Sequence, residues 1–335
     1  MNFGIVGFGL HAVKRLIGGF AKSSNCRVVA LSRRNPEKAR QSATQYNIPR
    51  AFTSTEELCQ CKDVDAVFVA SPNSIHLADV LTAVRHGKHV LCEKPMAMNA
   101  AECQQMVEAA HRANVHLGVA QVFRFEESTD WFRRRIGSGE IGTPVFARSE
   151  FSFFAGTHHP RSWIRDKMVA GGGPVADIGV HCIDALRFVL GDEVVRVTAR
   201  GTPANNGTVE DAATLLLEFS RGTLGTVAVS FRAEYRTPME IVGAAGVLRA
   251  DDALTVDKPI LLEFHRGGVT IETQTVENNL AYAKQVDAFA NAVDGKAEFP
   301  APGKEGWKNQ LVLDASYRSM RDGKVEDVPA LKQLA

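Results

Sequence analysis

Lys94, Asp177 and His181 are residues whose side chains can transfer protons, and the sequence around each of them suggests a role in catalysis. Lys94 follows the apolar run 89–92 and precedes a proline. Asp177 and His181 come after three consecutive glycines and a proline, and they are four residues apart. Because positions i and i+4 share one face of a helix, both side chains can reach the same group. If these three residues meet a bound dinucleotide, they would form an oxidoreductase centre.

A glycine pattern near the N-terminus predicts the dinucleotide site. Gly7, Gly9 and Ala12 form Gly-x-Gly-x-x-Ala after a predicted strand over 3–6 and at the start of a predicted helix over 11–22. The first glycine permits a tight turn, and the second lets the backbone approach a pyrophosphate at the helix N-terminus. We expect cofactor contacts from Gly7, Phe8, Gly9, Leu10 and His11.

The end of the next apolar run, 28–31, indicates which dinucleotide binds. A site for NAD usually has an acidic residue there, which accepts hydrogen bonds from the ribose hydroxyls. Here the run is followed by Ser32, Arg33 and Arg34. Guanidinium groups suit a 2′-phosphate, so we predict NADP(H) as the cofactor in preference to NAD(H). One of the two arginines could instead belong to a solvated basic turn.

Polar residues after the run 66–70 should lie at the same ligand edge, because ligands bind beyond the carboxyl ends of such strands. Ser71, Pro72 and Asn73 follow this run directly, and His76 comes three residues later. Ser71 or Asn73 could instead cap the next helix, and His76 could be a surface residue of that helix.

Residues that follow the predicted strands 89–92 and 115–119 should also lie at the ligand edge of the sheet. Lys94 would hydrogen-bond the reacting oxygen and stabilise negative charge on it. Glu93 could pair with Lys94 or contact the nicotinamide ribose. Gln121, which follows the run 115–119, is also expected to contact the cofactor.

These residues require a scaffold of two domains. Residues 1–121 alternate apolar runs with amphipathic stretches, which predicts an α/β Rossmann domain with a doubly wound parallel sheet. In residues 122–335 the predicted strands follow one another, which favours an α+β domain with a large, mostly antiparallel, open-faced sheet. Helices predicted over 280–293 and 304–321 could pack back on the first domain.

Alternating apolar positions in the second domain suggest self-association. The positions 215, 217 and 219, and likewise 227, 229 and 231, could bury an uncovered sheet face against a second subunit. We therefore expect a homodimer or homotetramer formed through the C-terminal sheet. A sheet closed by its own loops is the alternative.

Composition excludes several other classes of protein. The 335 residues are 45% hydrophobic and 23% charged with a net charge of +1, which gives no electrostatic case for nucleic acid or a membrane surface. Among the six cysteines, Cys59 and Cys61 are the only close pair, so no metal is expected. A first strand near Asn2 leaves no room for a signal peptide, and no apolar run is long enough to span a membrane. We expect a cytoplasmic protein.

The combined motifs resemble the Gfo/Idh/MocA family over nearly the whole chain. They are Glu93-Lys94-Pro95, the glycine turn, and the segment from Gly171 to Asp184. The resemblance implies a Rossmann domain followed by an open-faced sheet domain, and hydride transfer between a nicotinamide and a carbohydrate or cyclitol hydroxyl. By position, Lys94, Asp177 and His181 match the family's catalytic residues.

The resemblance also points to a further cofactor contact. NADP(H)-using members often carry an adjacent Trp-Arg pair eight residues before the glycine run, where it touches the cofactor. Here Trp163 and Arg165 stand at that place, but Ile164 separates them.

The expected reaction is reversible oxidation of a secondary alcohol on a sugar, polyol or cyclitol to a ketone, aldehyde or lactone. His181 would exchange the proton, Asp177 would orient it or bind a substrate hydroxyl, and the roles of His181 and Lys94 could be exchanged. Two other functions remain open: an NAD-dependent glycoside hydrolase of the same family, and a non-catalytic NADP(H)-binding sensor. Aromatic residues could line the substrate or belong to the core; they are Phe151, Phe153, Phe154, His158, His159 and Trp163.

Overall fold

The computed structural model describes residues 1–156, 159–203 and 207–331, so His158 lies outside the described residues. These residues form two compact units. The first contains Met1–Val122 and Leu280–Trp307, and the second contains Phe123–Asn279 and residues 308–331. The sequence division placed all of 122–335 in one domain, whereas Leu280–Trp307 cluster with the first unit because α9 packs on α1.

The first unit is built on a six-stranded, wholly parallel sheet, which confirms the predicted doubly wound domain. Its strands are β1 Asn2–Val6, β2 Arg27–Ser32, β3 Arg50–Phe52, β4 Ala66–Val69, β5 His89–Cys92 and β6 Leu117–Val119. Their order is β3-β2-β1-β4-β5-β6, so the winding direction reverses between β1 and β4. Ligands bind at such a switch point, beyond the carboxyl ends of the strands.

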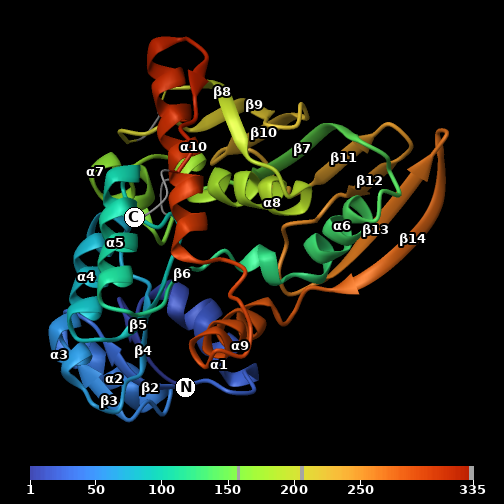
Figure 1. Ribbon diagram of the computed structural model, residues 1–335. Helices are drawn as coiled ribbons and strands as arrows, with labels where there is room; N and C mark the ends of the chain where they lie inside the picture. Colours follow the sequence, from blue (N-terminus) through green and yellow to red (C-terminus); the bar gives the residue numbers. More distant parts are fainter. Residues whose placement is uncertain (157–158, 204–206, 332–335) are drawn as a thin grey trace. The chain divides into compact units, whose positions relative to one another are not determined.

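Helices cover both faces of this sheet (Figure 1). Phe3 and Ile5 point into a core shared with α1 and α9, whereas the intervening Gly4 lies against Leu58 of α3. This alternation is the two-residue period of a strand buried on both faces. The helical segments are η1 Ala12–Leu16, α1 Ile17–Lys22, α2 Pro36–Gln45, α3 Thr55–Gln60, η2 Asn73–Ile75, α4 His76–Arg85, α5 Ala100–Arg112 and α9 Ala281–Val293.

Two elements of this unit, β3 and α3, were not expected from the sequence. The strand has only three residues and lacks an apolar run, so its pattern carries little signal. The helix does carry a start signal, because the Ser54 side chain accepts a hydrogen bond from the Glu57 N–H. This Ser-x-x-Glu pattern is a known helix N-terminus.

The second unit contains a nine-stranded sheet that is antiparallel except where β10 pairs with β7, which confirms the predicted mostly antiparallel sheet. The strands are β7 Pro144–Ser152, β8 Val194–Gly201, β9 Ala212–Phe219, β10 Leu224–Ser230, β11 Met239–Gly243, β12 Val247–Ala250, β13 Pro259–Arg266, β14 Val269–Glu277 and β15 Glu326–Asp327. Their order is β14-β13-β12-β11-β7-β10-β9-β8-β15.

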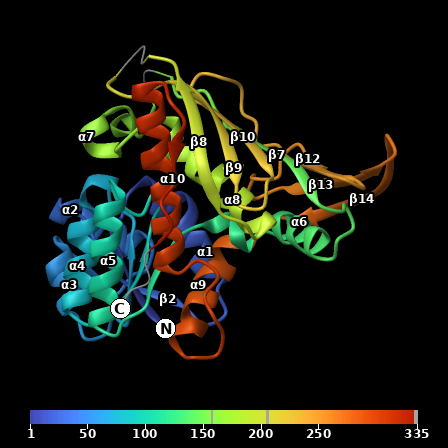
Figure 2. The same ribbon diagram turned by 45° about the horizontal axis from the view of Figure 1, so that its top comes forward.

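Two packed helices, α6 and α8, lie along one face of this sheet (Figures 1 and 2). The helical segments of the unit are η3 Val122–Phe125, α6 Glu127–Gly137, η4 Ser162–Arg165, α7 Lys167–Ala170, η5 Val175–Gly179, α8 Val180–Leu190 and α10 Gly303–Asp322, whose first five residues belong to the first unit. Within the described ranges, no helix combines the length and apolarity needed to cross a membrane.

The apolar alternation expected to face a second subunit is in fact the buried one. Leu217 and Val227 are fully buried, and Val229 lies against Gly179 of η5. The residues that alternate with them, such as Leu216 and Leu224, are exposed. The alternation therefore identified the strands correctly, but the apolar face is covered by helices of the same unit and not by a second subunit. The period shows which residues share a face, and it does not show what covers that face.

Candidate functional site

The glycine turn lies at the switch point of the parallel sheet. Gly7 has a φ of +74°, and a Cβ there would come within 2.6 Å of the Ser71 backbone. Only glycine therefore allows the loops after β1 and β4 to meet.

Gly9 has a different environment from Gly7. The nearest described protein atom to a Cβ at Gly9 would be the Gly7 carbonyl oxygen at 3.6 Å, an ordinary contact. No described protein contact therefore requires glycine here, whereas a pyrophosphate approaching the backbone would require it. Leu10, which follows, is exposed. The turn fits a dinucleotide.

Phe8 contributes to the core rather than to an open ligand surface. Its ring is buried and packs near Tyr46. Its backbone N–H donates to the Ser32 carbonyl oxygen at 3.0 Å. The predicted contact from Phe8 is thus limited, because its N–H is already used to join the ends of β1 and β2.

The end of β5 carries a carboxylate and an amine in sequence. Glu93 is buried, and its Oε1 lies 2.8 Å from His11 Nε2. Its Oε2 accepts from the Lys94 backbone N–H at 3.1 Å. The Lys94 side chain is half-buried. Glu93 therefore fixes the backbone at Lys94 and links it to the start of the first helix.

The electrostatics at Glu93 favour its ionised form. Burial by itself raises the pKa of Glu93, but the charge of His11, the hydrogen bond from His11 and the nearby Lys94 together outweigh burial. The pKa of Glu93 is therefore lowered. A buried carboxylate held ionised here is able to accept hydrogen bonds from a ligand.

Residues after β4 hold the backbone rather than line an open surface. The Ser71 hydroxyl donates to Asp79 Oδ2 at 2.6 Å, and Thr55 donates to the other Asp79 oxygen at 2.6 Å. His76 is fully buried, with its ring nitrogens directed at backbone carbonyls. The predicted direct contact of His76 with the cofactor is therefore not supported. Asn73 is buried, and Pro72 occupies the N-cap position of η2 without a side-chain hydrogen bond.

The basic pair after β2 divides into one tethered and one exposed arginine. Arg33 donates through Nη1 to Ser42 of α2 at 2.8 Å, while Arg34 is exposed. Ser32 is buried and supplies its carbonyl oxygen to Phe8. This donor set suits an anionic group, because both arginines can present N–H groups in a fork.

Gln121 lies beside the end of β5. The preceding Ala120 N–H donates to the Cys92 carbonyl oxygen at 2.7 Å, which continues the pairing of β6 with β5. The Gln121 side chain is 1% exposed, and its Nε2 has no hydrogen-bond partner in the part of the chain that the structure describes. A buried amide donor left unpaired costs free energy, so a bound group that accepts from it is expected.

In the second unit, the glycine run serves internal packing. A Cβ on Gly172 would lie 1.8 Å from the Tyr317 hydroxyl oxygen, and a Cβ on Gly173 would lie 2.3 Å from the Glu210 carbonyl oxygen. Gly171 has a φ of +80° and ends α7. The run therefore lets Tyr317 and Glu210 approach the start of the helical segment η5–α8.

The carboxylate of Glu210 caps this helical segment. It accepts from the N–H groups of Gly173 at 3.2 Å and Val175 at 3.1 Å, and from the Tyr317 hydroxyl at 3.0 Å. Burial raises the pKa of Glu210 despite these hydrogen bonds. The contacts fix the N-terminus of the element on which Asp177 and His181 stand.

Asp177 is bound by a residue that the sequence did not identify. Arg161 donates to the two Asp177 oxygens at 3.4 and 3.2 Å, and the Asp177 side chain is 10% exposed. The arginine lies sixteen residues earlier in an irregular segment, so no periodicity links the two. The pair orients the Asp177 carboxylate.

His181 is packed among aromatic rings. Phe123 meets it edge-on with ring centroids 4.8 Å apart, and Phe151 lies at 6.1 Å with the rings stacked. The other predicted aromatics do not form one wall with Phe151, because Phe153 packs on Phe231 while Phe154 is exposed. The rings restrict His181 to a narrow range of orientations.

Three further residues near this segment have contacts within the second unit. Asp184, on the same segment as Asp177, is buried and bound by Arg124 and Asn309, so it is structural. Gly179 lies against Val229 of β10, which would be in ordinary contact with a Cβ at this position. Arg165 donates to Asp211 at 2.7 Å and to the Ala155 carbonyl oxygen at 2.5 Å. Its guanidinium is thus committed within the second unit, and Trp163 beside it is half-buried.

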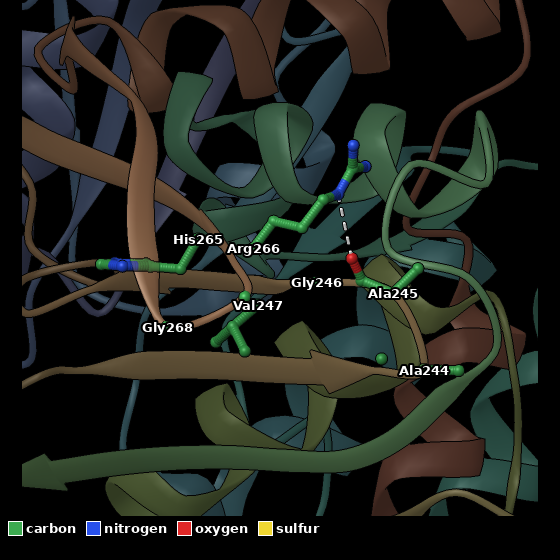
Figure 3. Close-up of a pocket in the computed structure, with 9 residues that line it drawn as sticks. Ala244, Ala245, Gly246, Val247, His265, Arg266 and Gly268 are labelled. Carbon is green, nitrogen blue, oxygen red and sulfur yellow. Dashed lines mark hydrogen bonds between the residues drawn. The ribbon is translucent and has the colours of Figure 1, made fainter.

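A hollow at the far turns of the large sheet contains none of these residues (Figure 3). It lies between the β11–β12 and β13–β14 turns. Arg266 there donates to the Ala245 carbonyl oxygen at 3.1 Å and to the Glu140 carbonyl oxygen at 2.9 Å, so its charge ties neighbouring turns together.

Two family descriptions match the chain. The Oxidoreductase family, NAD-binding Rossmann fold, matches residues 1–121, and the GFO/IDH/MocA C-terminal domain matches residues 130–249. Among similar proteins, a 1,5-anhydro-D-fructose reductase of Ensifer adhaerens is 33% identical over 314 residues, covering 91% of this chain and 92% of that protein. A D-xylose 1-dehydrogenase (NADP(+)) 2 of Haloferax volcanii is 30% identical over 324 residues, covering 96% and 98%.

Solved structures resemble the chain over nearly its full length. An aldose-aldose oxidoreductase from Caulobacter crescentus, complexed with glycerol, superposes with a TM-score of 0.89 at 27% identity, covering 98% of this chain and 99% of that one. A levoglucosan dehydrogenase in complex with NADH and levoglucosan has a TM-score of 0.85 at 23% identity, covering 98% and 100%. At that identity the likeness concerns the fold alone.

Proposed function

The chain belongs to the GFO/IDH/MocA family and is a nicotinamide-dependent oxidoreductase, and from this premise we propose that it interconverts a secondary hydroxyl and a carbonyl on a sugar, polyol or cyclitol, using NADP(H). The observation that carries the proposal is the position of Lys94. It follows β5, next to the β1–β4 switch point with its glycine turn, and Glu93 fixes its backbone. The sugar-directed names of the similar proteins support a carbohydrate substrate.

The preference for NADP(H) rests on the end of β2. No acidic side chain follows the strand, and Arg34 is exposed there. We expect Arg34→Ala to raise the Michaelis constant for NADP(H) and leave that for NAD(H) nearly unchanged. Arg50→Ala, an exposed arginine on β3 that pairs with Asp63, is the control. A wild-type enzyme that prefers NAD(H) would contradict this part of the proposal.

The bound nicotinamide supplies the chemistry of accepting a hydride from the substrate carbon or returning it. His181 accepts the hydroxyl proton in oxidation and returns it in reduction. Lys94 donates a hydrogen bond to the same oxygen and stabilises the charge that develops there. Asp177, bound to Arg161, orients His181 or accepts from a neighbouring substrate hydroxyl.

Single variants test these roles. His181→Ala should lower kcat by about 100-fold to 10,000-fold, as expected for the loss of a general acid–base. Lys94→Ala should lower kcat by about 100-fold to 1,000-fold, as expected for the loss of one donor to a charged oxygen. The pH profiles of the two variants would show which residue exchanges the proton. Near-native turnover in both would overturn the assignment.

The absorbance of the reduced nicotinamide distinguishes the other two functions. An oxidoreductase changes it in proportion to product, whereas an NAD-dependent glycoside hydrolase restores its cofactor within each turnover. A sensor would bind NADP(H) without turnover. A panel of sugars, polyols and keto-sugars, each offered with both cofactors, would identify the substrate.

The open face of the nine-stranded sheet supports self-association with a second copy of this chain. Exposed apolar side chains stand on it, and a row of alternating charges crosses β7, β11, β12 and β13. The apolar residues are Phe146, Leu216, Leu224, Leu261 and Ile271, and the charged row is Arg148, Glu240, Arg249 and Glu263. Alternating charge is self-complementary across a two-fold axis, as a closed dimer requires.

Sedimentation measures the proposed assembly directly. Leu216→Arg should shift the protein toward the monomer, because it places a charge within the apolar part of the face. Lys62→Glu, an exposed change in the first unit, is the control. A wild-type protein that is monomeric at high concentration would contradict the proposed dimer or tetramer.

The cysteines support a proposed cytoplasmic location. None of the six, all of which lie in the described ranges, forms a disulfide, and five are buried. Burial raises the pKa of Cys26 to about 11 and that of Cys182 to about 12, so both stay protonated. Reduced thiols of this kind are typical of reducing compartments. Fractionation of cells that express the protein would test the location.

A further inference from the structure

We propose that His76 is a positioning residue for Lys94, holding the loop after β5 against the loop after β4. The inference rests on the role proposed for Lys94. It assigns to His76 an indirect part in the reaction, in place of the direct cofactor contact expected from the sequence.

The ring of His76 lies between two loops of the ligand edge. It is fully buried, with Nε2 2.8 Å from the Ser71 carbonyl oxygen and Nδ1 3.1 Å from the Pro95 carbonyl oxygen. Pro95 is the residue that follows Lys94. A single side chain thus touches the backbone on both sides of the gap between the ends of β4 and β5.

One of the two loops has a second, independent anchor. The Ser71 hydroxyl is bound by Asp79, which also accepts a hydrogen bond from Thr55. Gly7 packs directly on the Ser71 backbone. The loop after β4 is therefore fixed whether or not His76 is present, and it serves as the fixed point from which His76 holds Pro95.

The loop after β5 is held from two sides of Lys94. On the N-terminal side, Glu93 accepts from the Lys94 backbone N–H and is itself paired with His11. On the C-terminal side, the His76 ring contacts the Pro95 carbonyl oxygen. Loss of His76 would therefore release one side of Lys94 while leaving the glycine turn and Ser71 in place.

The chemistry of imidazole suits this position. Both neighbours are carbonyl oxygens, which only accept hydrogen bonds. A neutral ring donates to one of them and packs against the other, and a protonated ring donates to both. Burial lowers the pKa of His76, while the carbonyl of Ser71 and the charge of Glu93 act in the opposite direction. Glutamine can still donate a hydrogen bond, but it lacks the rigid ring that directs one nitrogen toward each carbonyl, so we expect it to hold the two loops less firmly.

The experiment is a double-mutant cycle on the full chain with NADP(H) and a substrate from the panel above. His76→Gln should lower kcat by about 100-fold, the effect expected of a misplaced catalytic group, with little change in the dissociation constant for NADP(H). In the Lys94→Ala background the same change should have little further effect, because the residue that it positions is already gone. His86→Gln, at the other end of α4, is the control.

The cycle separates failure of this inference from failure of the proposed function. If His76→Gln slows the Lys94→Ala variant as much as it slows the wild type, His76 does not act through Lys94. If Lys94→Ala alone keeps near-native turnover, the catalytic role proposed for Lys94 is wrong, whatever the effect of His76→Gln. Should His76→Gln fail to fold, His76→Phe keeps a buried ring and removes both nitrogens.

Hydrogen exchange gives a readout that needs no turnover. In His76→Gln or His76→Phe, amide exchange should quicken in a peptide covering 93–98 and stay unchanged in one covering 1–10. If the substitution changes amide exchange to the same extent in both peptides, or in neither, the proposal is overturned.

Discussion

The glycine turn of the first unit and the glycine run of the second contain the same residue type for different reasons. At Gly7, the positive φ and the close Ser71 backbone require glycine. At Gly9, no described protein atom lies close enough to require it. At Gly172 and Gly173, by contrast, the space for a Cβ is filled by Tyr317 and Glu210. The first region leaves room for a ligand, whereas the second uses its glycines to bring parts of the protein together.

The polar groups of the two regions follow the same division. At the ligand edge, the buried Gln121 amide nitrogen has no partner within the described chain. Along η5–α8, Asp184 is bound by Arg124 and Asn309, and Glu210 by the helix N-terminus. The buried contacts of Asp184 and Glu210 thus support the helical segment that carries Asp177 and His181, while the Gln121 amide at the ligand edge is able to donate to a bound group.

The largest expected effect is on the buried ion pair of the second region. Asp184→Asn should lower the free energy of unfolding by about 3–5 kcal/mol, because it leaves the Arg124 guanidinium buried without its counter-charge. Denaturant titration measures this. Asp130→Asn, which removes an exposed pair with Arg134, should cost less than about 1 kcal/mol. Equal losses would mean that the second region is not held by buried contacts.

The glycine run gives the next largest effect. Gly172→Ala should lower the free energy of unfolding by about 1–3 kcal/mol or more, because the new methyl group would overlap the Tyr317 ring. Gly137→Ala on α6 meets no atom within 4 Å and should be neutral or slightly stabilising. If Gly172→Ala is tolerated but weakens cofactor binding, the division between the two regions is wrong.

Gly9→Ala tests the other side of the comparison. Stability should be unchanged or rise by about 0.5–1 kcal/mol, because alanine restricts the unfolded chain and meets no close protein atom. Affinity for the dinucleotide should fall by about ten-fold or more, equivalent to about 1.4 kcal/mol. Unfolding and cofactor-fluorescence titrations of one preparation give both values. A destabilised variant with normal affinity would show that Gly9 serves packing after all.

The smallest effect concerns the pH dependence of the ligand edge. Because the pKa of Glu93 is lowered in the folded protein, Glu93 stabilises the fold at any pH above its ordinary pKa of 4.5. This contribution is lost as the pH falls through the lowered pKa. His11→Ala should raise the pKa of Glu93 relative to wild type. The difference in unfolding free energy between the two proteins should therefore be present near neutral pH and vanish on acidification. A difference independent of pH would argue against the His11–Glu93 interaction.

Much of the fold could be predicted because its signals are local. Continuous apolar runs identified β1, β2, β4, β5 and β6, and the succession of predicted strands in 122–335 identified the antiparallel sheet of the second unit. The short β3 was missed because three residues carry no period, and the Leu217–Val227 face was assigned to the wrong partner. A period tells which residues share a face, but the burial of that face depends on what packs on it.

The candidate site divides in the same way. The sequence by itself determined that Lys94 follows a strand and that Asp177 and His181 stand on one helical segment, because both follow from local patterns of residues. Only the tertiary structure decided that Arg161 binds Asp177 and that His76 joins the loops of Ser71 and Pro95. Those contacts depend on side chains from different loops and elements meeting at specific distances, and no spacing within one segment encodes them.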